Sequence, residues 1–248
     1  MPLTLRTWEV RLGIVLVASS AAIYTAKYLL LGDPENTYTY IFNALGFLPI
    51  NVLLVTLILN QLLSIRAKRE RLEKLNMVIG TFFSEAGTWL LAFISDRDSE
   101  LPELREGLIV TEAWTPETFA GVCDRLQHHR SGIAVDAADL QDLRRYLQGR
   151  RDFFLRLLEN PALLEHESFT DLLRAVFHLT EELERRDDFA GLPASDIRHL
   201  TVDIERVYRL LAREWLAYME YLQKNYPYLF SLAMRSNPFD ETASPVVR

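Results

Sequence analysis

Two long apolar stretches fill most of the first quarter of the chain. Residues 10–31 contain two charged side chains, and residues 36–65 contain none. A helix of about 20 apolar residues is long enough to cross the hydrocarbon core of a bilayer. We therefore predict a two-helix transmembrane hairpin over residues 1–65, with spans at about 10–31 and 41–64. Asp33-Pro34 favours a turn in the connection between them.

A cluster of basic side chains follows the second apolar stretch at once. Cytoplasmic flanks of membrane spans carry an excess of Lys and Arg, and such a cluster suits the anionic inner leaflet. The connection between the spans carries acids, Asp33 and Glu35, and no base. This charge pattern predicts a multi-pass protein of the inner membrane with both termini in the cytoplasm. The cluster consists of Arg66, Lys68, Arg69, Arg71 and Lys74.

Polar and small residues interrupt both predicted spans. An amide in hydrocarbon needs a hydrogen-bond partner, because an unsatisfied polar group costs several kcal/mol there. Pairing of helices, within the hairpin or between subunits of a homo-oligomer, is the favoured interpretation, and lining of a pore is the alternative. Asn43, Asn51 and Asn60 do not share one helical stripe, which weakens the pore interpretation. The candidate residues are Asn43, Pro49, Asn51, Asn60, Gln61, Ser19, Ser20 and Lys27.

Beyond the spans, apolar residues recur at helical spacing and show no strand-like alternation of useful length. Residues 66–95 are predicted to form an amphipathic stalk helix. Residues 96–240 are predicted to form a cytoplasmic all-α bundle, so the fold class is all-α. Helix starts are expected at Thr115-Pro116, Asp136, Ser168 or Thr170, and Ser195. Residues 241–248 are predicted to be a disordered tail.

Composition excludes some partners and chemistries. The net charge of −7 argues against nucleic acid as a partner, since phosphate binding favours a net basic face. The single cysteine, Cys123, excludes an intrachain disulfide and suits a reducing compartment.

No recognisable catalytic or ligand-binding motif occurs. The glycine-rich phosphate loops and the H-E-x-x-H and C-x-x-C metal motifs are absent from the sequence. A metal site in a helical bundle usually needs paired Glu-x-x-His motifs on facing helices. The chain offers only two incomplete versions, Asp196-x-x-His199 and His178-x-x-Glu181. We therefore predict no metal, cofactor or catalytic residue and no enzymatic activity. An unfamiliar lipid-directed enzyme using Glu85 or His178 is the least favoured hypothesis.

Three stretches carry a resemblance to a known group. FLPINVLLVTLILNQLLS, NMVIGTFFSEAG and NYPYLFSLAMRSNPFD are similar to uncharacterised two-span membrane proteins of bacteria and archaea. The resemblance implies a prokaryotic membrane-anchored helical protein and carries no known activity. The favoured function is a non-enzymatic integral membrane protein, a scaffold or sensor. Its cytoplasmic domain would mediate self-association or binding of a protein partner. The alternative is a subunit of an oligomeric ion channel.

Overall fold

The computed structural model describes residues 7–31, 34–161, 163 and 166–246. It divides into two compact units, Met1–Lys68 and Arg69–Arg248. Every regular element in the described residues is a helix, and the sole β-type pairing there is an isolated bridge between Asp98 and Ile133. The predicted all-α fold class is confirmed.

The first unit contains helix α1 (Thr7–Leu31) and the first part of helix α2 (Pro34–Phe82). Near the connection, the rings of Tyr24 and Tyr40 lie 6.3 Å apart, and the Lys27 ammonium lies 5.1 Å from the Tyr40 ring centre. Helix α2 continues through Pro49 without ending. The predicted turn at Asp33 lies outside the described residues.

Helix α2 carries the strongest membrane-like signal of the described residues. It is the one helix there that is long and apolar enough to cross a membrane, by length and composition alone. Its most apolar window has a mean hydropathy of 2.1, and no residue of that window is buried. The apolar part of α1, Ile14–Leu30, is shorter.

The chain stays helical from Pro34 to Ser95, with one change of geometry. A π-helical turn, Phe83–Gly87, separates α2 from helix α3 (Thr88–Ser95). The backbone carbonyl of Glu85 in this turn accepts a hydrogen bond of 2.8 Å from Arg150 Nε, and the Tyr146 hydroxyl lies 3.4 Å from the same oxygen. Such turns leave carbonyl groups without their usual helical partners, and the neighbouring helices supply replacements here.

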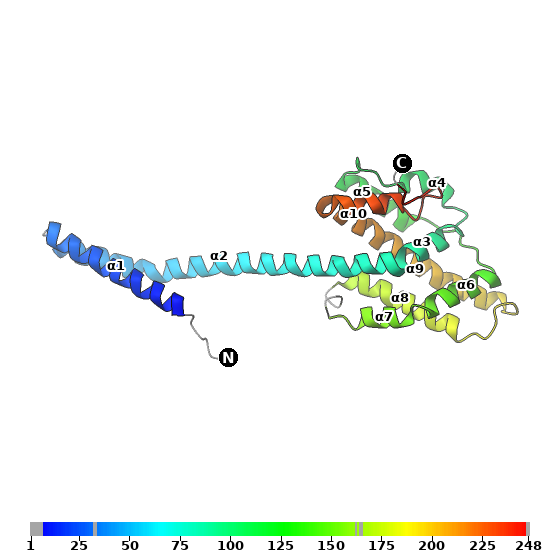
Figure 1. The fold of residues 1–248 in the computed structure, drawn as a ribbon, viewed down its shortest axis with the longest axis horizontal. Coiled ribbons are helices and arrows are strands. Elements are labelled where there is room, and N and C mark those ends of the chain that lie inside the picture. Colours follow the sequence, from blue (N-terminus) through cyan, green and yellow to red (C-terminus); the bar gives the residue numbers. More distant parts are fainter. Residues whose placement is uncertain (1–6, 32–33, 162, 164–165, 247–248) are drawn as a thin grey trace. The chain divides into compact units, whose positions relative to one another are not determined.

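The remaining helices belong to the second unit (Figure 1). Some begin where the sequence predicts: Thr115 Oγ1 accepts a hydrogen bond from the Thr118 amide, and Asp136 forms a capping box with Asp139. The helices are α4 (Pro102–Arg105), the 3₁₀ turn Glu106–Leu108, α5 (Pro116–His128), α6 (Ala137–Gln148), α7 (Arg151–Leu158), α8 (Glu167–Glu184), α9 (Ala194–Asn225) and α10 (Pro227–Arg235).

Two predicted helix starts were wrong. Ser168 and Thr170 lie inside α8, because the imidazole of His166 accepts the capping bond from the Phe169 amide. Ser195 lies in the first turn of α9, which begins directly after Pro193. Histidine is not among the usual capping residues, so the sequence signal pointed to the hydroxyls instead.

Helix α9 is the centre of the second unit. It packs against α3, α5, α8 and α10, and its buried face repeats every three to four residues through Leu200, Ile204, Val207 and Leu211. Burial of these side chains, rather than helix propensity, stabilises the bundle.

Candidate functional site

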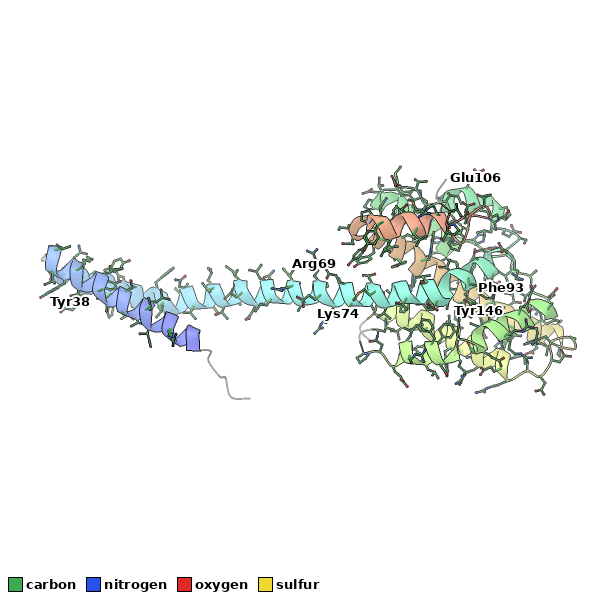
Figure 2. All side chains as sticks on the ribbon, in the orientation of Figure 1. Tyr38, Arg69, Lys74, Phe93, Glu106 and Tyr146 are labelled. Atoms are coloured by element: carbon green, nitrogen blue, oxygen red, sulfur yellow. The ribbon has the colours of Figure 1, made fainter. Side chains whose placement is uncertain are left out.

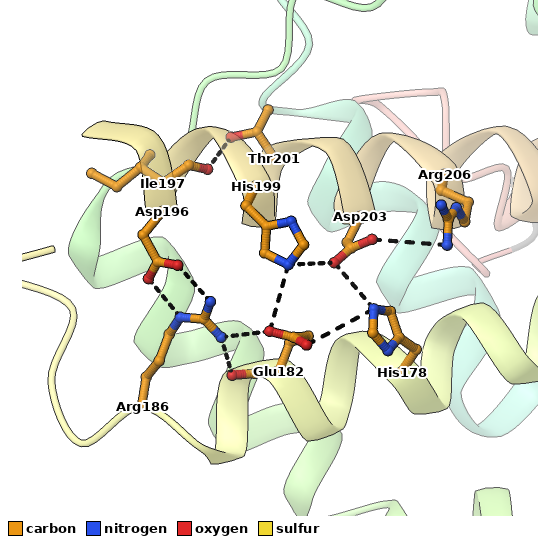
Figure 3. Close-up of polar contacts among 9 residues, drawn as sticks. All are labelled: His178, Glu182, Arg186, Asp196, Ile197, His199, Thr201, Asp203 and Arg206. Atoms are coloured by element: carbon orange, nitrogen blue, oxygen red, sulfur yellow. Dashed lines mark hydrogen bonds and ion pairs between the residues drawn. The ribbon is translucent and has the colours of Figure 1, made fainter. Parts of the chain in front are cut away.

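A polar cluster lies between two helices that are otherwise held together by apolar contacts. Helices α8 and α9 are joined by residues 185–193 and pack against each other. His178 and Glu182 are four residues apart on α8, as are His199 and Asp203 on α9. Residues at this spacing share one face of a helix. Figure 3 shows these two rows facing each other across the helix pair.

The four side chains form a closed ring of charged and titratable atoms. His178 Nε2 lies 3.4 Å from Asp203 Oδ2 and 4.0 Å from Glu182 Oε1. His199 Nε2 lies 3.6 Å from the same Asp203 oxygen and 3.6 Å from Glu182 Oε2. All four separations exceed the 2.7–3.2 Å range of N–H···O hydrogen bonds. The ring is therefore a set of close imidazole–carboxylate contacts rather than a set of hydrogen bonds.

Asp203 is the buried member of the ring. Its side chain is 6% exposed, whereas those of His178 and His199 are 45% and 51% exposed. Arg206 Nη1 lies 3.9 Å from Oδ1, but Oδ2 has no hydrogen-bond partner among the described residues. A buried carboxylate oxygen without such a partner is costly. The imidazoles of His178 and His199 are the side chains that face this oxygen, at 3.4 and 3.6 Å.

Arg186 holds Glu182, the other carboxylate of the ring, in place. Its Nη1 donates a 2.9 Å hydrogen bond to Glu182 Oε2, and its Nε and Nη2 donate 2.7 Å bonds to the two oxygens of Asp196. These bonds are the main reason that the pKa values of Glu182 and Asp196 lie below their ordinary values. They also raise the pKa of the Arg186 guanidinium. Glu182 and Asp196 therefore stay ionised well into the acid range.

We expect the contribution of Arg186 to stability to be lost in acid. Carboxyl groups with a depressed pKa stabilise the fold above their ordinary values, near 4.5 for Glu182 and 3.8 for Asp196, and this effect disappears as pH falls through the lower folded values. Arg186→Gln should therefore lower the urea midpoint at pH 7, and the gap between wild type and variant should narrow as pH falls below these ordinary values. Urea unfolding of the full chain in detergent across this range measures the difference.

An exposed pair offers the matched control for this prediction. Arg174 lies 3.4 Å from Asp171, with side chains 68% and 51% exposed. Arg174→Gln should leave the midpoint nearly unchanged at every pH, because exposed pairs contribute about 0–1 kcal/mol. A gap between wild type and Arg186→Gln that does not narrow as pH falls below 3.8, the ordinary pKa of an aspartate, would contradict the assignment.

The residues predicted to pair helices or line a pore all lie in the first unit. The side chains of Ser19, Ser20, Asn43, Pro49, Asn51, Asn60 and Gln61 are exposed, and Lys27 is partly covered. The structure brings Lys27 and Tyr40 together. Helix pairing and pore lining by the others remain predictions.

The predicted basic cluster lies along α2. Its side chains are exposed, and Arg69 Nε lies 3.3 Å from Glu73 one turn later. Figure 2 shows Arg69 and Lys74 extending away from the helix. Arg66 and Arg71 have interaction partners as well. Contact of this cluster with lipid headgroups remains a prediction.

A second imidazole–carboxylate pair lies near the end of α5. The buried His129 Nε2 lies 2.8 Å from Asp98 Oδ2, and Asp98 Oδ1 accepts bonds from the amides of Gly132 and Glu100. Every oxygen of Asp98 is thus satisfied. The pair ties residues 129–132 to the segment that follows α3, and each carboxylate oxygen of Asp98 has a partner.

The sequence contained a signal for the α8–α9 cluster at a different spacing from the one considered. His178-x-x-Glu181 and Asp196-x-x-His199 drew attention to three-residue steps. The contacts instead follow the four-residue steps His178-x-x-x-Glu182 and His199-x-x-x-Asp203. The packing of α8 on α9 decides which spacing faces inward.

The comparisons with known proteins define the class of this chain as a two-part helical protein. A family model described as "Uncharacterized protein MJ1433, C-terminal helical domain" matches residues 71–235, and "MJ1433, N-terminal helical domain" matches residues 4–63. The chain belongs to this MJ1433 family. It is 44% identical to the uncharacterized protein MJ1433 of Methanocaldococcus jannaschii over 229 residues, 92% of each chain. No solved structure matches.

Proposed function

We propose that the chain is a non-enzymatic integral membrane protein that anchors a helical domain at the cytoplasmic face of the membrane. The observation that carries the proposal is the apolar run of α2, whose most apolar window has a mean hydropathy of 2.1 and no buried residue. Exposing so many large apolar side chains to water is unfavourable at about 25 cal/mol per Å². A lipid environment removes that cost. The apolar stretch of α1 supplies the other span of the proposed hairpin.

The orientation rests on charge. The basic side chains of α2 follow its apolar run and are exposed, while Glu35 is an acid in the first turn. Basic residues are retained on the cytoplasmic side of spans. The second unit, which begins within this cluster at Arg69, is therefore cytoplasmic in our proposal.

The role of the helical domain is to bind another protein or a second copy of the chain. Helix α10 buries Phe230 but leaves Tyr228, Leu229 and Leu232 exposed by 71%, 39% and 46%. Exposed apolar side chains grouped on one helix are typical of interaction surfaces. Leu232→Glu is expected to shift the mass of the detergent-solubilised particle toward the monomer if self-association uses this helix.

Membrane insertion is tested by charging the centre of α2. Each Arg at the centre of a span costs about 2.5–3.5 kcal/mol, and about a dozen apolar residues each contribute roughly 0.3–0.6 kcal/mol. The triple variant Ile50→Arg, Leu54→Arg and Leu57→Arg should therefore leave the carbonate-resistant membrane fraction. All three side chains are more than half exposed in the single chain.

A charge added to α2 beyond the apolar run is the control. Met77→Arg places a cation on an exposed position of the same helix and should leave the protein in the membrane. Retention of the triple variant in the membrane, or release of the wild-type chain by carbonate, would refute the proposed anchor.

A further inference from the structure

We propose that the α8–α9 cluster is a binding site for one divalent transition-metal ion, held by His178, Glu182, His199 and Asp203. Two imidazole nitrogens and two carboxylates form a ligand set typical of zinc and related ions. The proposal concerns the helical domain and does not depend on the membrane anchor.

The first observation that supports it is the spacing of the ligand atoms. Zinc lies about 2.0–2.2 Å from nitrogen and oxygen ligands, so neighbouring ligand atoms in a tetrahedron are about 3.3–3.5 Å apart. Three of the four separations in the ring are 3.4, 3.6 and 3.6 Å. The fourth, from His178 Nε2 to the other oxygen of Glu182, Oε1, is 4.0 Å, so a carboxylate rotation would be needed for one Glu182 oxygen to serve both contacts. These atoms are too far apart for hydrogen bonds and close to the spacing that a shared cation sets.

The second observation is the buried oxygen of Asp203. Its Oδ2 faces both imidazoles and has no hydrogen-bond partner among the described residues, although only 6% of the side chain is exposed. Buried charges are usually paired or coordinate a metal. A cation at the centre of the ring would satisfy this oxygen and would be coordinated by the Nε2 atoms of the two imidazoles in their unprotonated form.

Small rotations complete the site. With the side chains in their present positions, no group of three or more His, Cys, Asp or Glu in the described residues could hold a metal ion, so the proposed site requires the imidazoles to rotate. His178 and His199 are each about half exposed, so their rings have room to turn inward. Asp203 is held by its burial and Glu182 by Arg186. The two carboxylates are therefore the fixed ligands, and the two imidazoles are the ligands that rotate to complete the site.

The two neighbouring arginines, Arg186 and Arg206, contact the carboxylates from outside the ring. Arg186 hydrogen-bonds one oxygen of Glu182 and is itself balanced by both oxygens of Asp196. Arg206 lies 3.9 Å from the outer oxygen of Asp203. Outer partners of this kind orient metal-binding carboxylates. Because two carboxylates are present, the site would carry no net charge with a divalent ion and neutral imidazoles.

The test is a Zn²⁺ titration of the full chain in detergent, purified without a polyhistidine tag and stripped with chelator. Calorimetry at pH 7 should show about one equivalent bound with Kd below about 10 µM. Thermal unfolding should shift upward with Zn²⁺, because a ligand that binds the native state stabilises it. Mg²⁺ and Ca²⁺, which prefer all-oxygen sites, should produce neither effect at the same concentration.

Variants assign the binding to the cluster. His199→Gln removes an exposed ligand and should weaken Zn²⁺ binding at least about tenfold while leaving the circular dichroism spectrum unchanged. His128→Gln is the matched control, because His128 is 78% exposed and faces Asp124 at 3.5 Å outside the cluster. Binding of less than half an equivalent overturns the proposal, as does equal binding by wild type and His199→Gln. Loss of Zn²⁺ binding leaves the membrane proposal intact, since carbonate extraction tests that separately.

Discussion

Phe82→Ala will lower the free energy of unfolding of the helical domain by about 3–5 kcal/mol. Phe82 is fully buried and lies at the last position of α2. Its ring packs edge-on against Phe83 and Phe169 and lies 6.4 Å from Phe154. Truncation therefore leaves a cavity lined by three rings from three helical segments. Urea unfolding of the full chain, followed by the fluorescence of the buried Trp215, measures the loss.

Met77→Ala is the control for this prediction. Met77 lies on the same helix and is 64% exposed, so its truncation should change the unfolding free energy by less than about 0.5 kcal/mol. A loss below about 1 kcal/mol for Phe82→Ala would show that α2 does not end in the core of the domain.

Asp98→Ala is expected to lower the free energy of unfolding of the helical domain by about 3–5 kcal/mol. The Asp98 side chain is fully buried and accepts bonds from His129, from the Gly132 amide at 2.8 Å and from the Glu100 amide at 3.1 Å. Its removal leaves three donors without an acceptor inside the protein. The same urea measurement applies.

The exposed counterpart of this pair provides the comparison. Asp124 and His128 lie 3.5 Å apart with side chains 71% and 78% exposed. Asp124→Ala should cost at most about 1 kcal/mol, because water screens and solvates both groups. Similar losses of unfolding free energy for Asp98→Ala and Asp124→Ala would mean that burial does not determine the contribution of Asp98 to stability.

Much of the helical architecture follows from local patterns. The apolar stretches, the absence of strand alternation, the Thr115 and Asp136 caps and the helix after Pro227 are all readable in the sequence, and the structure has helices at each place. These features depend on side chains within a few residues of each other. Local physics is sufficient for them.

Other features depended on partners far along the chain. The π-helical turn at Phe83–Gly87 is matched by donors from Tyr146 and Arg150, about 60 residues away. The cap of α8 came from His166 rather than from a hydroxyl. The imidazole of His129 contacts the buried carboxylate of Asp98, which lies 31 residues earlier in the chain. No local pattern distinguishes these outcomes.

The sequence by itself determined the fold class, the apolar run of α2 and the basic cluster that follows it, because each is a property of consecutive residues. The tertiary structure decided which polar residues meet. His178, Glu182, His199 and Asp203 come from two helices, and their approach depends on the rotation of α8 and α9 about their axes. That rotation is set by the apolar faces that both helices bury, so the polar cluster is a consequence of packing that no single helix encodes.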